Sequence, residues 1–398
     1  MPVNFLEISN QITEKGGRVH EYVAVHTNLI EQARHLLEQY SGDVELLQQR
    51  VEKAAALSSG LRCAAPTQEY LTSSIAALPV DYPYVILAAD GSQINPSRHD
   101  QVEFGVINVG TIRMMPGQAI APSENIKSEL LALDDLVTSD GQPVGEDIVA
   151  LRRDLFERSI LSELAKNEQL PVVALTDGPL ELFREPRGEG QAIKKEYSDL
   201  LQAYLGTLQE LADQNSIVGG YVDKPKSDLV VRLLELLQLN NDELNQAGVK
   251  RSLRGITDAG LLMSILHPGE RSAVFSIQSQ TLNNFSGRLA LHFFYLNVGY
   301  GNHPALARVE IPAWVAQDKT LLNLLHVVLV NQCKQMGTRP YPYVIHRAHE
   351  VAVVTFDEKQ KLIDMIATEW DRQGIWVDNI SNKQAGKDAF GAKKRYKK

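Results

Sequence analysis

Tyr84 to Ser92 reads YVILAADGS and Pro171 to Pro179 reads PVVALTDGP, and these two stretches are the strongest indication of the fold class. Each opens with an apolar run of the length of one buried strand and closes with an Asp-Gly pair. Because Gly permits a tight turn, each strand is expected to end at its aspartate. Ligands of open α/β sheets bind beyond the carboxyl ends of the strands. The two stretches therefore predict an α/β sheet that holds Asp90 and Asp177 at a ligand-binding edge.

Other strand and helix patterns follow along the chain. Apolar and small residues partly alternate over 102–114, which is typical of one or two antiparallel strands. Strands first, followed by alternating helices and strands, indicate a mixed α/β fold. Further strands are expected at 218–222, 288–298, 306–311 and 351–356, and helices at 146–166, 191–213, 226–239, 318–335 and 357–372.

Three regions are expected in the 398 residues. Residues 1–75 form a helical N-terminal extension, because apolar residues recur at helical spacing and no Pro occurs between Asn4 and Leu57. This extension either packs on the main domain or serves as an arm that contacts another protein. Residues 76–380 form the main domain, and residues 381–398 form a basic disordered tail.

The charge is unevenly distributed. The whole chain carries a net charge of −9, but residues 383–398 hold seven Lys or Arg and one Asp, which leaves −15 on the remainder. An acidic body argues against broad attraction to nucleic acid, although a local basic groove stays open. The tail is either a solvated end or a loose arm for a phosphate backbone or an acidic partner.

The cysteine content and the N-terminus indicate a cytoplasmic protein. Cys63 and Cys333 are too few for a disulfide framework, so a reducing compartment is expected. The first residues contain no basic segment followed by an apolar run, so no signal peptide is expected. No apolar stretch reaches the roughly 18 residues of a membrane span.

Carboxylates at the two strand ends suggest metal chemistry. Paired carboxylates suit Mg²⁺ or Mn²⁺, and two such ions are able to hold the attacking and leaving oxygens of a phosphodiester displacement. Glu157 lies at the border of the apolar stripe of helix 146–166, and Glu163 on the same helix competes as the third carboxylate. The alternatives stay open: Asp-Gly is a common turn pair, and helix glutamates are usually solvated.

Aromatic and imidazole side chains cluster between Tyr341 and His349. His346 and His349 have i, i+3 spacing, but no HExxH pattern or cysteine pair supports a zinc site. A histidine near a carboxylate site is able to bind metal or orient water, and the alternative is a hydrogen-bonded structural residue. No Walker lysine loop, GxGxxG or GxSxG occurs, so motor or α/β-hydrolase chemistry is unsupported.

An ordered set of short motifs spans about residues 84–356. The set consists of Ala89-Asp90-Gly91-Ser92-Gln93, Arg153-x-x-x-Glu157, Leu175-Thr176-Asp177-Gly178-Pro179-Leu180, Gly219-Gly220-Tyr221-Val222-Asp223-Lys224, Ile256-Thr257-Asp258-Ala259, Pro268-Gly269-Glu270-Arg271-Ser272, Arg308-Val309-Glu310-Ile311-Pro312, and Tyr341-Pro342-Tyr343 through Ala348-His349-Glu350. In this order the motifs resemble those of the NurA nuclease family.

The resemblance implies an RNase H-like mixed sheet flanked by helices and a Mn²⁺-dependent nuclease, with Mg²⁺ as the alternative ion. It implies DNA as the substrate, a homodimer, and a hexameric HerA-type ATPase as the partner in end resection. Matched to the motifs, Asp90, Glu157 and Asp177 are the metal-binding carboxylates. Tyr341 and His349 match the C-terminal active-site aromatic and histidine, with His349 also a metal ligand.

The hypothesis is therefore a metal-dependent DNA nuclease with 5′-to-3′ exonuclease and single-strand endonuclease activity. Asp90, Glu157 and Asp177 hold the ions, His349 binds metal or positions water, and Tyr341 stacks on a base or bonds a phosphate. A second hypothesis is a non-catalytic DNA-binding adaptor of a HerA-type ATPase. A third is a phosphoesterase that acts on small molecules, for which the sequence gives little support.

Overall fold

The computed structural model describes residues 3–98, 102–182, 190–301 and 303–374. The basic tail predicted at 381–398 lies outside these residues. The chain divides into two units, each built from two segments. Unit 1 consists of Met1–Val80 and Tyr221–Pro340, and unit 2 consists of Asp81–Gly220 and Tyr341–Lys398. The division predicted near residues 75 and 380 stays a prediction.

The sheet of unit 2 begins with three antiparallel strands, β3 (Val85–Ile94), β4 (Gly105–Met114) and β5 (Ser123–Leu131). β6 (Val172–Asp177) then pairs with the other side of β3 in the parallel direction. The first residues of β7 (Ile217–Val222) follow beside β6. The resulting order β5-β4-β3-β6-β7 confirms the predicted RNase H-like mixed sheet.

β3 is longer than its sequence pattern indicated. Its first five residues are fully buried, as expected for the apolar run. The strand does not end at Asp90, however, because Asp90 to Ile94 continue to pair with Gly110 to Val106 of β4. The predicted turn at this Asp-Gly pair is therefore wrong. At the second pair the expectation is confirmed: β6 ends at Asp177, and Gly178 follows with a φ of +81°.

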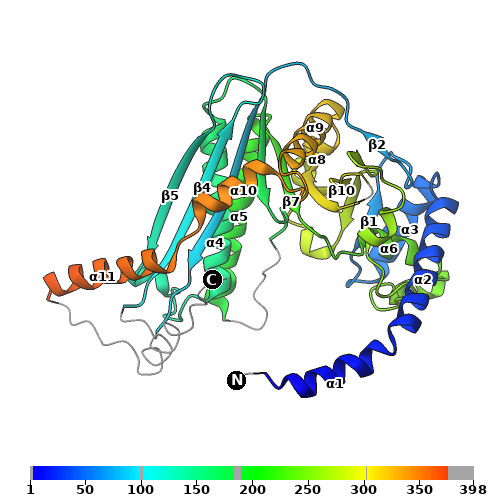
Figure 1. Ribbon diagram of the computed structural model, residues 1–398, viewed down its shortest axis with the longest axis horizontal. Helices are drawn as coiled ribbons and strands as arrows, with labels where there is room; N and C mark the ends of the chain where they lie inside the picture. Colours follow the sequence, from blue (N-terminus) through cyan, green and yellow to red (C-terminus); the bar gives the residue numbers. More distant parts are fainter. Residues whose placement is uncertain (1–2, 99–101, 183–189, 302, 375–398) are drawn as a thin grey trace. The chain divides into compact units, whose positions relative to one another are not determined.

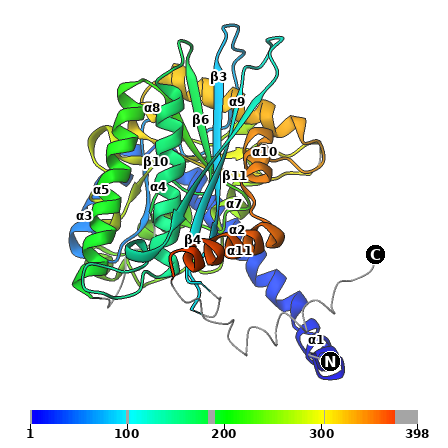
Figure 2. The ribbon, with the colours of Figure 1, turned by 90° about the vertical axis from the view of Figure 1, so that its left-hand side faces the viewer.

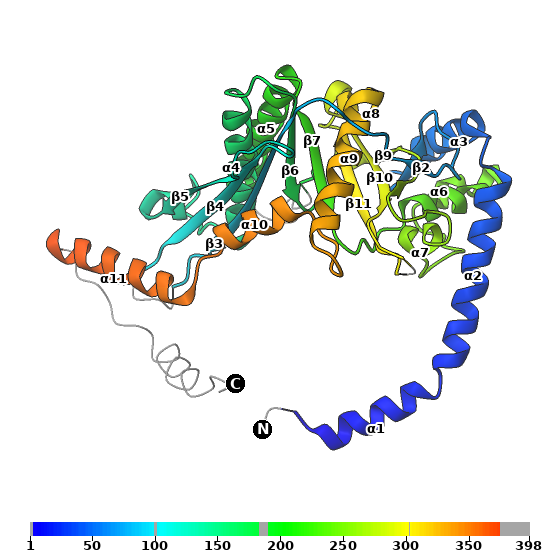
Figure 3. The ribbon, with the colours of Figure 1, turned by 45° about the horizontal axis from the view of Figure 1, so that its top comes forward.

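Helices cover both faces of this sheet (Figures 1 and 3). α4 (Glu146–Ala165) and α5 (Gln191–Asp213) run side by side along one face (Figure 2). α10 (Tyr343–Ala352) crosses β3 and β4 on the other face, and α11 (Phe356–Arg372) follows it. Consecutive strand residues point to opposite faces, so β3 presents alternate side chains to α4 and to α10.

The strand predicted at 351–356 is wrong. Val351 and Ala352 complete α10, and Thr355 begins α11 as its N-cap. The Thr355 side chain accepts a hydrogen bond from the backbone N–H of Glu358, whose carboxylate in turn accepts from the N–H of Thr355. This capping box fixes the helix start, and a short apolar run before it does not distinguish helix from strand.

Unit 1 contains a second set of antiparallel strands. β1 (Cys63–Pro66), β9 (Phe275–Gln278), β10 (Leu291–Asn297) and β11 (Leu306–Pro312) pair in this order. The short strand β8 (Glu270–Arg271) pairs with β10 and with β2 (Ile75–Ala76). The α-helices of unit 1 are α1 (Phe5–Gly16), α2 (Val19–Gln39), α3 (Val44–Leu57), α6 (Leu229–Leu237), α7 (Asp258–Leu262), α8 (Ala313–Ala316) and α9 (Lys319–Gln335).

The core of unit 1 joins the N-terminal helices to the later strands. Leu37 of α2, Leu47 of α3 and Leu233 of α6 lie in one buried cluster with Phe275 and Phe293 of the sheet. α1 differs, because none of its residues is buried, and it extends away from the rest of unit 1 (Figure 3). The chain is helical in α1, α2 and α3, up to Leu57, whereas β1 and the start of β2 are strands inside the range 1–75 that is predicted to be helical. α1 itself contributes no residue to the core, and the separate N-terminal extension stays a prediction.

The part of the chain that the structure describes holds no helix with the length and apolar character needed to cross a bilayer.

Candidate active site

The two aspartates lie on neighbouring strands. β3 and β6 are parallel, and Ala89 pairs with Thr176, so Asp90 and Asp177 occupy the next positions. Paired residues of parallel strands point to the same face of a sheet. Burial raises the pKa of Asp177, the Tyr341 hydroxyl opposes this, and the neighbouring Asp90 carboxylate raises it further. The sheet thus brings together two acids that are 87 positions apart and lets them repel one another.

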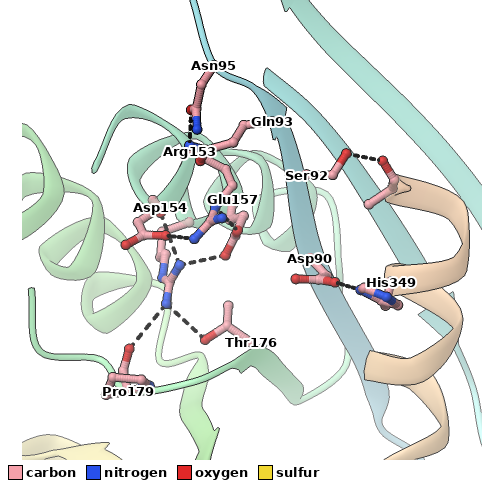
Figure 4. Close-up of polar contacts among 12 residues, drawn as sticks. Asp90, Ser92, Gln93, Asn95, Arg153, Asp154, Glu157, Thr176, Pro179 and His349 are labelled. Carbon is pink, nitrogen blue, oxygen red and sulfur yellow. Dashed lines mark hydrogen bonds and ion pairs between the residues drawn. The ribbon is translucent and has the colours of Figure 1, made fainter. Parts of the chain in front are cut away.

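One C-terminal segment supplies a partner to each aspartate. The Tyr341 hydroxyl donates to Oδ1 of Asp177 over 2.7 Å. Nδ1 of His349, on α10, lies 2.6 Å from Oδ2 of Asp90 (Figure 4). The Asp90 side chain is only 13% exposed, whereas that of His349 is 62% exposed. Four of the five predicted site residues therefore converge, with the imidazole on the solvent side.

α10 lies close to the sheet because β4 carries a glycine where the helix crosses it. Gly110 pairs with Asp90, and a Cβ added there would lie 2.5 Å from the Ala348 carbonyl oxygen and 2.7 Å from the Ala352 nitrogen. The side chains of Ser92 and Asn108 both donate to the Ala352 carbonyl. These three residues hold the helix that carries His349. Sequence reasoning missed them, although a Gly inside a strand is a known signal of close backbone approach.

Glu157 reaches β3 from the opposite side. It is 3% exposed, and its Oε1 lies 2.7 Å from the position that a Cβ of Gly91 would occupy. Gly91 follows Asp90, so its missing side chain faces α4. Glu163, the competing acid of the same helix, instead pairs with Lys127 of β5. Of the two helix acids, Glu157 is the one beside the aspartates.

Two arginines of α4 hold the Glu157 carboxylate. Nη1 of Arg158 lies 2.6 Å from Oε2, and Nε of Arg153 lies 3.4 Å from Oε1 (Figure 4). Burial raises the pKa of Glu157 to about 8; Arg158 and Arg153 oppose the shift, and Asp154 and Asp90 add to it. The Asp90 carboxylate therefore raises the pKa of both other acids.

A divalent cation fits the donor chemistry of this site. Carboxylate oxygens are the preferred ligands of Mg²⁺ and Mn²⁺, and the raised pKa of Asp177 reflects a charge that a cation would compensate. Within the described residues, no three His, Cys, Asp or Glu side chains already stand close enough to hold one ion. Asp90, Asp177 and His349 nevertheless offer oxygen and nitrogen donors for part of a cation site. Glu157 lies beside them and is paired with arginines.

His346 and His349 of α10 have different partners. His346 lies 3.6 Å from Glu350, and His349 contacts Asp90.

The sequence profile of the NurA domain matches residues 84–354. No curated protein matches the sequence. Similar solved structures are the NurA nuclease of Sulfolobus solfataricus, at 13% identity over 89% of this chain and 98% of that one with a TM-score of 0.46, and the catalytic domain of human Endonuclease V, at 13% identity over 82% and 98% with a TM-score of 0.31.

Proposed function

This chain belongs to the NurA family, since the domain profile covers residues 84–354, and on that premise we propose that it is a metal-dependent nuclease that hydrolyses DNA. The observation that carries the proposal is the placement of Asp90 and Asp177 on adjacent parallel strands, each contacted by one residue of the segment 341–349. Family membership supports a nuclease. The substrate, the ion and the roles of individual residues are what we propose.

In this proposal Asp90 and Asp177 bind the cation through carboxylate oxygens, and His349 and Glu157 supply further ligands. When bound, Mn²⁺ or Mg²⁺ lowers the pKa of water and neutralises charge on the phosphate. The Tyr341 hydroxyl fixes the orientation of Asp177. His349 uses Nδ1 toward Asp90, which leaves Nε2 to bind the ion or to hold water or phosphate. We also propose that Tyr341 stacks on a base or bonds a phosphate.

The finer activity follows the family. We propose Mn²⁺ as the preferred ion, 5′-to-3′ exonuclease and single-strand endonuclease activity, and a role in end resection. The partners are a second copy of this chain and a hexameric HerA-type ATPase. An apolar face of α1 supports such assembly: Phe5, Ile8 and Ile12 recur at helical spacing and are 67%, 43% and 66% exposed. Large exposed apolar patches mark interaction sites.

The direct test compares the wild-type protein with Asp90→Asn on linear and circular single-stranded DNA, with Mn²⁺, Mg²⁺ or EDTA. We expect Mn²⁺-dependent cleavage of both substrates by the wild type, and a loss of at least about 100-fold in the variant with the fold intact. Cleavage by Asp90→Asn at the wild-type rate would show that the site is assigned to the wrong residues.

Two observations favour a second function, a non-catalytic DNA-binding adaptor of a HerA-type ATPase. Glu157 is paired with two arginines, and the described residues contain no ready group of three metal ligands. The two functions differ in nucleotide release from linear DNA in Mn²⁺, measured with the protein alone and with its ATPase. Release in either case supports the nuclease, and no release in both supports the adaptor.

A further inference from the structure

Arg158 is a buried arginine that the proposed chemistry does not use. It follows Glu157 on α4, is 3% exposed, and lies over the ring of Tyr204 with its Cζ atom 5.7 Å from the ring centroid. Its Nε has no hydrogen-bond partner among the described residues. A buried charge with an unpaired N–H costs folding free energy. The burial of Arg158 is therefore not explained by a gain in stability alone.

The guanidinium of Arg158 connects α4 to the strand end that carries Asp177. Nη1 donates to Oε2 of Glu157 over 2.6 Å. Nη2 donates to Oγ1 of Thr176 over 3.3 Å and to the Pro179 carbonyl over 3.4 Å (Figure 4). Thr176 and Pro179 lie on either side of the Asp177-Gly178 pair, so one side chain holds this turn at both ends.

The faces of the sheet explain this arrangement. Thr176 and Asp177 are consecutive, so Thr176 points toward α4 while Asp177 points toward the face of Asp90. Arg158 therefore contacts the turn from behind and leaves the Asp177 carboxylate free to face its neighbours. Gly178 has a φ of +81°, a left-handed conformation that glycine adopts readily, so the chain turns directly after Asp177.

We propose that Arg158 is a positioning residue of the acidic site: by binding Glu157 and the turn at Asp177 together, it sets their separation and thereby the affinity for a divalent cation. This inference rests on the proposed function. Residues that orient metal ligands typically change metal affinity by about 10–100-fold when they are replaced. The flat, forked guanidinium contacts Glu157, Thr176 and Pro179 at the same time. A lysine ammonium does not reproduce this geometry.

Arg152 offers a matched control. It lies on the same helix and also connects separate segments, since it donates to the Asp135 carbonyl over 2.8 Å and pairs with Glu196 of α5. It touches none of the proposed site residues. Removal of either arginine therefore breaks a comparable set of structural contacts, but only Arg158 contacts the surroundings of the acids.

The experiment measures Mn²⁺ binding to the full-length protein by electron paramagnetic resonance of free Mn²⁺, with thermal unfolding as the check on folding. We expect Arg158→Met to weaken binding by about 10–100-fold and Arg158→Lys to fall between it and the wild type. Arg152→Met should bind Mn²⁺ like the wild type. Thr176→Val, which removes one hydroxyl of the bridge, should weaken binding by about fivefold, the equivalent of one hydrogen bond.

The outcomes separate the two proposals. If the wild type binds Mn²⁺ and folded Arg158→Met binds it equally well, the positioning role is wrong and the nuclease proposal stands. If Arg158→Met does not fold, Thr176→Val decides, and wild-type affinity in that variant overturns the inference. If the wild type binds no Mn²⁺ and cuts no DNA, the proposed function fails first and the inference with it.

Discussion

The carboxylate of Asp177 stands in a position that stability alone would not favour. Asp177 is exposed to solvent at the end of β6, yet partial desolvation of its carboxylate and the neighbouring Asp90 both raise its pKa. Asp177→Asn removes the unfavourable charge and keeps the shape. We predict that this variant loses Mn²⁺-dependent DNA cleavage by at least about 100-fold while its melting temperature stays equal or rises. Cleavage assays and thermal unfolding on one preparation test both halves, and a large fall in melting temperature would contradict this reading.

Asp258, in unit 1, should make stability depend on pH. Burial raises its pKa from an ordinary value near 4 to about 7, although hydrogen bonds from Val231 N–H and the Tyr295 hydroxyl oppose the shift. Between these pH values the folded state holds a proton that the unfolded chain has lost. The stabilisation is therefore fully present below about pH 4 and is lost as pH rises through 7.

Asp258→Asn should remove this dependence. From pH 7 down to pH 4 we expect the wild type to gain stability over the variant by about 1.4 kcal/mol per pH unit. Thermal unfolding of both proteins across this range measures the difference. Parallel pH profiles would show that Asp258 is ionised in the folded protein.

For single residues, local sequence signals single out the acids, whereas the residues that hold them give no such signal. Asp90 and Asp177 each follow an apolar run, and Glu157 lies beside the apolar stripe of its helix. Arg158 gives no such signal, because its role depends on Thr176 and Pro179, which only the fold brings near. The local pattern of apolar residues does not show which distant segments will lie side by side.

The position of α10 depends on a close contact with the sheet at Gly110 of β4. A Cβ at Gly110 would meet backbone atoms of Ala348 and Ala352, which cannot rotate away. We predict that Gly110→Ala costs about 1–3 kcal/mol and displaces His349 from Asp90, with a loss of cleavage on the order of 10–100-fold. Chemical denaturation and cleavage assays measure the two effects.

Gly206 is the matched control for that substitution. It lies exposed inside α5, and a Cβ there meets nothing within 4 Å. Gly206→Ala should stabilise the protein by about 0.5–1 kcal/mol, because alanine loses less conformational freedom in a helix, and should leave cleavage unchanged. If both substitutions changed the free energy of unfolding in the same direction, the role given to Gly110 would be wrong.

Helices and strands with long patterns could be predicted well, whereas their ends depended on partners. The helix expected at 191–213 matches α5. β3 runs past Asp90 because β4 supplies hydrogen-bond partners up to Ile94, a pairing that a local Asp-Gly signal conceals. The strand expected at 351–356 failed because helix and strand compete for short apolar runs, and the Thr355–Glu358 capping box decided the outcome.

At the scale of the whole molecule, the apolar face of α1 should serve assembly rather than folding. Phe5 and Ile12 are exposed, and α1 has no buried residue. We predict that Phe5→Asp with Ile12→Asp changes unfolding by less than about 0.5 kcal/mol but abolishes association with a HerA-type ATPase in sedimentation experiments. Gln11→Asp with Thr13→Asp, also exposed on α1, is the control and should associate normally. Normal association of the first variant would assign the contact elsewhere.

The family and the mixed sheet could be predicted from ordered motifs, because strand-end acids and apolar runs are local signals. The composition of the two units could not, since each combines segments separated by more than a hundred residues. The wide separation of Asp90, Asp177 and His349 in the chain hides their proximity in the same way.

We propose that Asp90 and Asp177 share one divalent cation. A crystal of the full-length protein soaked in Mn²⁺, with diffraction recorded at the manganese absorption edge, locates that ion. We predict an anomalous peak in contact with carboxylate oxygens of both aspartates, and its loss in Asp90→Asn crystals. Well-ordered aspartates without a peak, or a peak that touches neither of them, would show that the two residues do not form a cation site.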